Sequence, residues 1–188
     1  MQHWVTPTYP SGVRLRWQGV LDLPEMYRYM KRWLQDRGFV DDNGFTNGGK
    51  WTQGPDEDEN TQHNLEKKYT ERRQQTSKLL EIEWRASNQM TDYFRYNIWI
   101  TFFMPGITEQ ETEQGGVKRK LDRGDFDLRM GAHVETPDGD DFESMSWMQK
   151  MNFRFIQHKR LQMHKRDLYL LFYLFHKDLR DYIKNARY

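Results

Sequence analysis

The chain has 188 residues, of which 36% are hydrophobic and 15% are Phe, Trp or Tyr. That length suits one domain with a substantial core, because each buried aromatic ring removes far more surface from water than an alanine does. We therefore expect a single domain over 1–188. The 29 basic and 28 acidic residues leave a formal charge of +1, so the overall charge favours no partner of either sign. The absence of cysteine excludes disulfides and thiolate chemistry.

The first predicted elements are a strand and a helix. Residues 13–20 alternate apolar and polar side chains, the pattern of a half-buried strand. Asp22 followed by Glu25 is typical of a capping box, and apolar residues then recur at helical spacing until Gly38. Residues 41–63 are rich in turn formers and like charges, so we expect an exposed loop there.

Several strands are predicted after this loop. Residues 65–73 favour an edge strand over a charged helix. Residues 80–87 and 94–104 both alternate strongly, and the intervening "NQMTD" predicts a hairpin turn.

A separate charged hairpin is predicted next, with Gly115-Gly116 as its turn. That turn pairs Gln114 with Val117 and brings acidic residues opposite basic ones. Residues 125–135 predict the last strand.

The chain from about 142 to 186 is helical in character, with a bend expected near 157–161. The whole predicts an α+β fold, with an antiparallel sheet of about six to seven strands, one helix after the first strand, and a long C-terminal helical segment packed on the sheet. This element order resembles the helix-grip arrangement of START-like proteins, in which a curved antiparallel sheet wraps a long terminal helix. The resemblance implies a cavity for an apolar ligand between the sheet and that helix.

The strongest local charge bias lies between residues 150 and 166, where no acidic residue occurs. Basic side chains mixed with aromatic ones suit nucleic acid, and a polybasic stretch beside an apolar helix suits an anionic membrane. The candidate contacts to an anion or a partner are Lys150, Arg154, Lys159, Arg160, Lys165 and Arg166.

The apolar residues of the last helix form more than one stripe. Leu161, Leu168, Phe172, Phe175 and others predict the face that packs on the sheet. Further apolar residues broaden the surface beyond that face. Others lie on the second face of strand 94–104, which indicates either a central strand covered on both sides or an exposed interaction patch. The candidates for an apolar interface are Tyr93, Trp99, Phe103, Tyr169 and Tyr173.

No catalytic, metal or cofactor motif is complete. "GFTNGGK" at 44–50 has the glycine and lysine spacing of a P-loop, but Trp51 stands where the magnesium-binding hydroxyl is required. The histidines have no ligand spacing, and the acidic cluster at 138–143 does not fit a calcium loop and instead suits the start of a helix. We expect no enzyme activity, cofactor or metal.

The function expected from these patterns is a non-catalytic binding or assembly protein whose C-terminal helices form the interaction surface, with a protein partner or self-association. One alternative is a helix-grip-like carrier of an apolar small molecule. Another is a peripheral binder of anionic membrane or nucleic acid through residues 150–166. No signal-like segment or membrane-spanning run of apolar residues is found, which favours a cytoplasmic protein.

Overall fold

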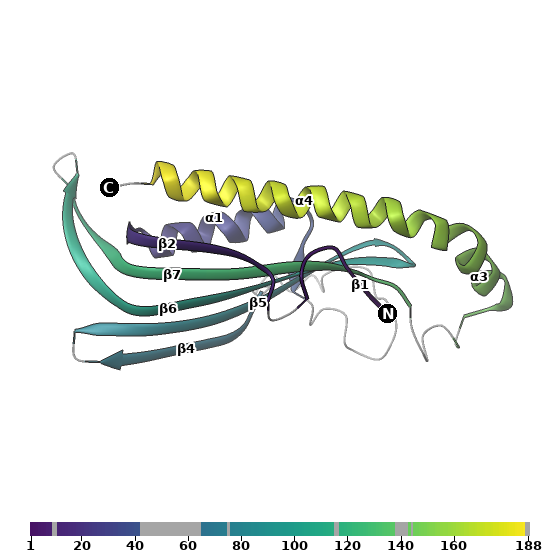
Figure 1. The fold of residues 1–188 in the computed structure, drawn as a ribbon, viewed down its shortest axis with the longest axis horizontal. Coiled ribbons are helices and arrows are strands. Elements are labelled where there is room, and N and C mark those ends of the chain that lie inside the picture. Colours follow the sequence, from purple (N-terminus) through teal and green to yellow (C-terminus); the bar gives the residue numbers. More distant parts are fainter. Residues whose placement is uncertain are drawn as a thin grey trace, which may run out of the picture.

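The computed structural model describes residues 1–8, 11–41, 65–74, 76–114, 117–137, 143 and 145–186. An antiparallel sheet forms one layer, and helices α1 and α4 lie together on one side of it (Figure 1). The strands are β1 (Gln2–Trp4), β2 (Val13–Leu21), β3 (Val40–Asp41), β4 (Glu66–Gln74), β5 (Ser77–Thr91), β6 (Phe94–Gln114) and β7 (Val117–Glu135). The helical elements are α1 (Leu23–Gln35), α3 (Trp147–Asn152), the π-helical segment η2 (Phe153–Gln157) and α4 (His158–Asn185).

The seven strands occupy five positions across the sheet, because each of the two outermost positions holds two strands, one after the other along the edge. The central strand β6 lies between β5 and β7. β1 and β2 both pair with β7, and β3 and β4 both pair with β5. The predicted α+β class with an antiparallel sheet is thus confirmed. Helix α1 follows β2, which is the second strand because β1 comes before it. Strand β1 has only three residues and is too short to show an alternating pattern in the sequence.

The predicted register of the charged hairpin is confirmed, because Gln114 pairs with Val117. Its turn residues lie outside the described part of the chain. The prediction of a separate hairpin was wrong, however, since β6 and β7 run continuously from the core of the sheet to its end. Their register shifts between Phe103 and Thr108, where Gly106 takes a φ of 68°. A bulge of this kind bends a strand without ending it.

Helix α1 begins and ends where the sequence predicts. The Asp22 carboxylate accepts a hydrogen bond from the Glu25 backbone N–H at 2.9 Å and so satisfies one of the free amides of the first turn. After the last turn Gly38 adopts a φ of 77°, which glycine reaches without the steric strain that a side chain brings.

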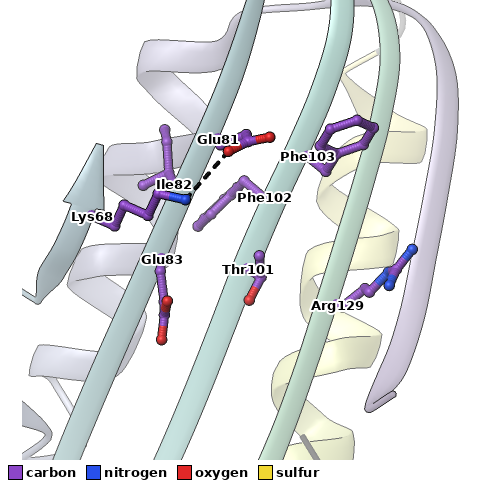
Figure 2. Close-up of a pocket in the computed structure, with 8 residues that line it drawn as sticks. All are labelled: Lys68, Glu81, Ile82, Glu83, Thr101, Phe102, Phe103 and Arg129. Atoms are coloured by element: carbon purple, nitrogen blue, oxygen red, sulfur yellow. Dashed lines mark hydrogen bonds and ion pairs between the residues drawn. The ribbon is translucent and has the colours of Figure 1, made fainter. Parts of the chain in front are cut away.

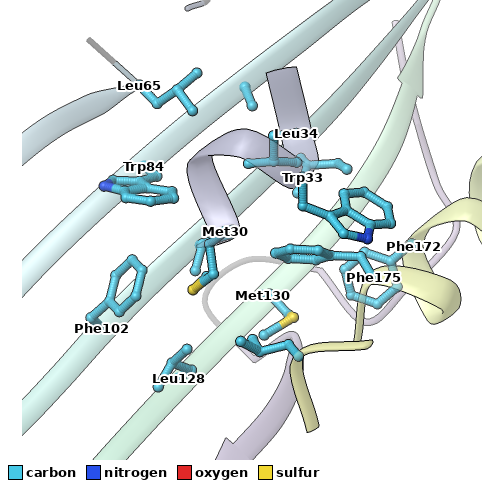
Figure 3. Close-up of a cluster of buried hydrophobic side chains, with 14 of the residues drawn as sticks. Met30, Trp33, Leu34, Leu65, Trp84, Phe102, Leu128, Met130, Phe172 and Phe175 are labelled. Carbon is cyan, nitrogen blue, oxygen red and sulfur yellow. The ribbon is translucent and has the colours of Figure 1, made fainter. Parts of the chain in front are cut away.

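The core lies between the two helices and the inner face of the sheet (Figure 3). Trp33 of α1 packs its ring 4.7 Å from that of Phe175 and donates from Nε1 to Asp178 at 2.9 Å, both on α4. The predicted packing stripe of α4 is confirmed at six positions, and its seventh residue, Leu171, is partly buried. The six buried residues are Leu161, Leu168, Phe172, Phe175, Leu179 and Ile183.

The break expected near 157–161 corresponds to η2, a π-helical turn immediately before α4. Such turns insert one extra residue per turn and shift the faces of the flanking helices. The predicted loop 41–63 lies outside the described residues except for Asp41, which ends β3. None of the described helices is long and apolar enough to cross a membrane.

Candidate functional site

The face of α4 opposite the core carries a line of exposed apolar side chains, which we call the outer face of α4. Met163, Leu170 and Leu174 are 55%, 55% and 41% exposed. Their spacings of seven and four residues place them on one line along the helix. Tyr169 and Tyr173 are also exposed and lie beside that line, with their rings 4.4 Å apart.

Three of the predicted basic residues, Lys159, Arg160 and Arg166, are exposed on α4 near this line. Arg154, Lys159, Arg160 and Arg166 are exposed, and within the described residues none of these four is within 4.0 Å of a carboxylate. Lys165 is half-buried.

Lys150 differs from the other five, because it lies on α3. Its Nζ donates to the backbone carbonyl of Glu143 at 3.0 Å. Four of the six predicted basic residues therefore lie on α4, whereas Lys150 makes a separate local contact on α3.

The interface candidates Trp99 and Phe103 on β6, and Tyr93 in the turn just before it, do not form one exposed patch. Phe103 is 40% exposed, and Tyr93 is partly buried with its ring 5.8 Å from that of Phe153. Trp99 is only 6% exposed, which agrees at this position with a central strand covered on both sides rather than with an exposed patch. The reason is Gly131 on the neighbouring strand, where a Cβ atom would come within 2.6 Å of Trp99 Nε1.

His164 of the basic segment is held by the sheet. Its ring stacks on Phe94 with centroids 4.1 Å apart, and its Nδ1 is 2.9 Å from the Tyr96 hydroxyl. Burial lowers the pKa of His164 and raises that of Tyr96 to about 12, so both groups are neutral near pH 7. His164 therefore ties α4 to β6.

The sheet face without described helices, which we call the outer sheet face, carries a row of polar side chains. Ser87, Asn97, His133 and Trp4 stand directly opposite one another on β5, β6, β7 and β1. The Ser87 hydroxyl donates to Asn97 Oδ1 at 2.6 Å. The Asn97 amide nitrogen donates to Glu135 Oε2 at 3.0 Å and lies 3.3 Å from His133 Nε2.

This row forms the floor of a hollow of about 520 Å³. Arg85, Arg95, Glu83 and Glu135 form its charged walls, and Trp4 and Trp99 line it as well. The volume falls within the range of small-molecule sites.

His133 is neutral in this environment. Burial lowers its pKa to about 4, against a smaller opposing effect of Glu135. Because Asn97 donates toward Nε2, the proton of the neutral ring is on Nδ1, which is buried and has no hydrogen-bond partner among the described residues. The imidazole is thus fixed in one tautomer.

A second, smaller hollow of about 310 Å³ lies further along the outer sheet face (Figure 2). Thr101 and Phe103 of β6 line it together with Glu81 and Glu83 of β5, and Glu83 is shared with the first hollow. The Thr101 hydroxyl is buried and has no hydrogen-bond partner in the described part of the chain.

A third hollow of about 700 Å³ lies beside the first turns of α1, on the core side of the sheet. Its wall includes Tyr27, whose hydroxyl donates to Glu66 and accepts from Trp84 Nε1 at 2.9 Å. Burial raises the pKa of Tyr27 well above its usual value. Leu23 and Leu80 provide apolar surface, but Lys78, Glu66 and Asp122 also line the hollow, so it is not the apolar cavity under α4 that a helix-grip carrier requires.

Trp99 and Phe103 of the outer sheet face were candidates from the sequence, but its polar row was not, because those polar residues alternate like those of any solvated strand. The glycine at position 131 within an otherwise alternating strand was the available signal, since such a glycine marks a close approach. Within the described ranges, no group of three or more His, Asp or Glu side chains is placed to hold a metal ion.

Comparisons with known proteins do not identify relatives of this chain. No protein-family model matches it, and neither a curated protein nor a solved structure matches it. The geometry of the two surfaces described above is therefore the basis for a functional proposal.

Proposed function

We propose that the chain is a non-catalytic binding protein that docks on an anionic membrane surface through the outer face of α4. The observation that carries this proposal is the composition of that face, where exposed apolar side chains lie among exposed cations. A helix with this composition lies in the plane of a membrane interface, with its apolar side chains below the headgroups and its cations among them.

The position of α4 supports a flat contact. It is 28 residues long and runs along one side of the molecule, with its outer face directed away from the sheet (Figure 1). At 1.5 Å per residue it extends for roughly 40 Å. The inner face is already held by Phe172 and Phe175 in the core, so docking requires no unfolding of the helix.

Charge favours an anionic partner over a second copy of the chain. Lys159, Arg160 and Arg166 lie in the first third of α4, before its first acidic residue, Asp167. An anionic surface attracts each such cation by about 1 kcal/mol, whereas an identical basic surface repels it. The apolar line adds a second, short-range contribution.

The test is co-sedimentation with vesicles of phosphatidylcholine, with and without phosphatidylserine. We expect binding only to the anionic vesicles, and weaker binding as salt is raised. Replacing Lys159, Arg160 and Arg166 with Gln lowers the partition coefficient roughly a hundredfold, given about 1 kcal/mol per cation.

A matched control removes three exposed arginines from the sheet, Arg16, Arg72 and Arg123, and should leave most of the binding intact. The proposal is wrong if the two triple variants bind anionic vesicles equally well, or if the wild-type protein does not bind anionic vesicles. A mass that doubles with protein concentration, and reverts in the variant Leu170→Ser with Leu174→Ser, would instead assign the outer face of α4 to self-association.

A further inference from the structure

The outer sheet face contains side chains that are more buried than those of an ordinary solvent-exposed sheet face. Ser87 and Trp99 are 1% and 6% exposed, although α1 and α4 lie on the opposite side of the sheet (Figure 1). The Trp99 indole lies across Gly131 and beside Gly12, where added Cβ atoms would come within 2.6 and 2.5 Å of the ring. Two positions without side chains therefore let the indole lie flat, beside the 520 Å³ hollow that it lines.

From this arrangement we propose that the hollow over Ser87, Asn97 and His133 binds a neutral sugar.

The charged walls of the hollow present donors and acceptors side by side. The Arg85 guanidinium lies 2.9 Å from Glu83, and that of Arg95 lies 3.5 Å from Glu135. Each cation is balanced by a carboxylate, so the walls attract neither an anion nor a cation strongly. A sugar hydroxyl both donates and accepts a hydrogen bond, and it can therefore use the two members of such a pair at once.

The remaining surface suits the carbon side of a sugar ring. Trp4 and Trp99 line the hollow, and the Trp4 ring packs at 4.7 Å against His133. An indole offers a flat apolar surface on which aliphatic C–H groups pack. Trp99 is almost completely covered, so the accessible part of this apolar surface is supplied mainly by the half-buried Trp4.

The floor is arranged before any ligand arrives. The Asn97 amide accepts from Ser87 and donates to Glu135, so its orientation is fixed. His133 is held neutral in one tautomer beneath Trp4. A floor that does not rearrange loses little entropy on binding, which is how small polar ligands are held with useful affinity.

Saturation-transfer NMR with the full chain tests the site. The probes are glucose, galactose, N-acetylglucosamine, maltose and cellobiose, with adenosine and AMP as the nucleobase and anionic arms. We expect saturation transfer to at least one sugar and not to AMP. Signal from adenosine and AMP alone, or from no probe at all, would overturn the assignment.

Variants locate the binding. Glu135→Gln and Arg95→Gln each remove one member of a donor and acceptor pair and should weaken sugar binding roughly tenfold or more. Arg72→Gln, an exposed change on β4, serves as the matched control and should bind as the wild type does. Far-UV circular dichroism confirms that each variant is folded. Unchanged affinity in folded Glu135→Gln and Arg95→Gln would show that the sugar binds elsewhere, which contradicts the proposal.

This site is independent of the membrane proposal. The Lys159, Arg160 and Arg166 variant changes no residue of the hollow and should bind sugar like the wild type, and Glu135→Gln should bind vesicles like the wild type. The failure of one proposal is therefore distinguishable from the failure of the other.

Discussion

The two faces of the sheet are built from the same strands but differ in the side chains that they present. The inner face presents Ile82, Ile100 and Leu128 to the helices and excludes water mainly by packing apolar side chains. The outer sheet face presents Ser87, Asn97 and other polar side chains that satisfy one another across neighbouring strands. Stability is therefore concentrated on one face, whereas the geometry needed for recognition is concentrated on the other.

The largest expected effect tests whether the inner face dominates stability. Phe172 is fully buried between α4 and the sheet, so Phe172→Ala should lower the free energy of unfolding by about 3 to 5 kcal/mol. The adjacent Tyr173, 38% exposed, is the control, and Tyr173→Ala should change stability by about 0.5 kcal/mol or less. Urea unfolding measures both. Equal losses would break the distinction between the two faces of α4.

The next effect tests whether the outer sheet face also contributes, through His133. Because its pKa is about 4 in the folded protein and 6.5 in the unfolded chain, the unfolded state takes up a proton first as pH falls. Stability should therefore decline between about pH 6.5 and pH 4, by about 3 kcal/mol in total.

The groups around His133 set the size of that decline. Glu135 favours the protonated ring, whereas Arg85, His3 and the amino terminus oppose it. In His133→Gln the slope should shrink to what His164 and His176 supply, whose pKa values burial also lowers. Urea unfolding at pH 7 and pH 5 measures the slope, and an unchanged slope in His133→Gln would exclude His133 as its source.

A smaller effect tests how tightly Trp99 is packed on the outer sheet face. Gly131→Ala places a Cβ atom in the space of the indole and should cost about 1 to 3 kcal/mol. Trp99→Leu should relieve part of that cost, so the two changes should be non-additive in a double-mutant cycle. Purely additive losses would mean that Trp99 moves aside freely.

The smallest effect compares a helix that belongs to the core with one that does not. Asp22→Ala removes the cap of α1 and should lower stability by about 1 kcal/mol. Ser146→Ala removes the capping box of α3, in which no residue is buried, and should leave the unfolding midpoint almost unchanged. Thermal unfolding followed by circular dichroism compares them. A larger loss in Ser146→Ala would place α3 in the cooperative core.

Elements with a clear local pattern were predictable from the sequence. Asp22 and Gly38 mark the ends of α1 by local backbone chemistry, and Gln114 with Val117 sets a register that follows from a two-residue turn. The buried stripe of α4 follows from helical spacing alone. These features depend on residues close together in the chain.

Features that depend on distant residues were not predictable. The burial of Trp99 requires Gly131 on another strand, and the polar row joins Ser87 to His133 through Asn97. Strand β1 forms only because β7 offers an edge to Gln2 and its neighbours. A single sequence gives the pattern within each strand but not the partner across from it.

The pairing of β2 with β7 also constrains when β2 can fold during synthesis. Val13 pairs with Met130, so β2 leaves the ribosome long before its partner strand exists. Until then its apolar side chains have no sheet to join, and such unpaired strands are where newly made chains aggregate. Folding is therefore expected to wait for β7, and a pause in synthesis before residue 130 would expose this strand for longest.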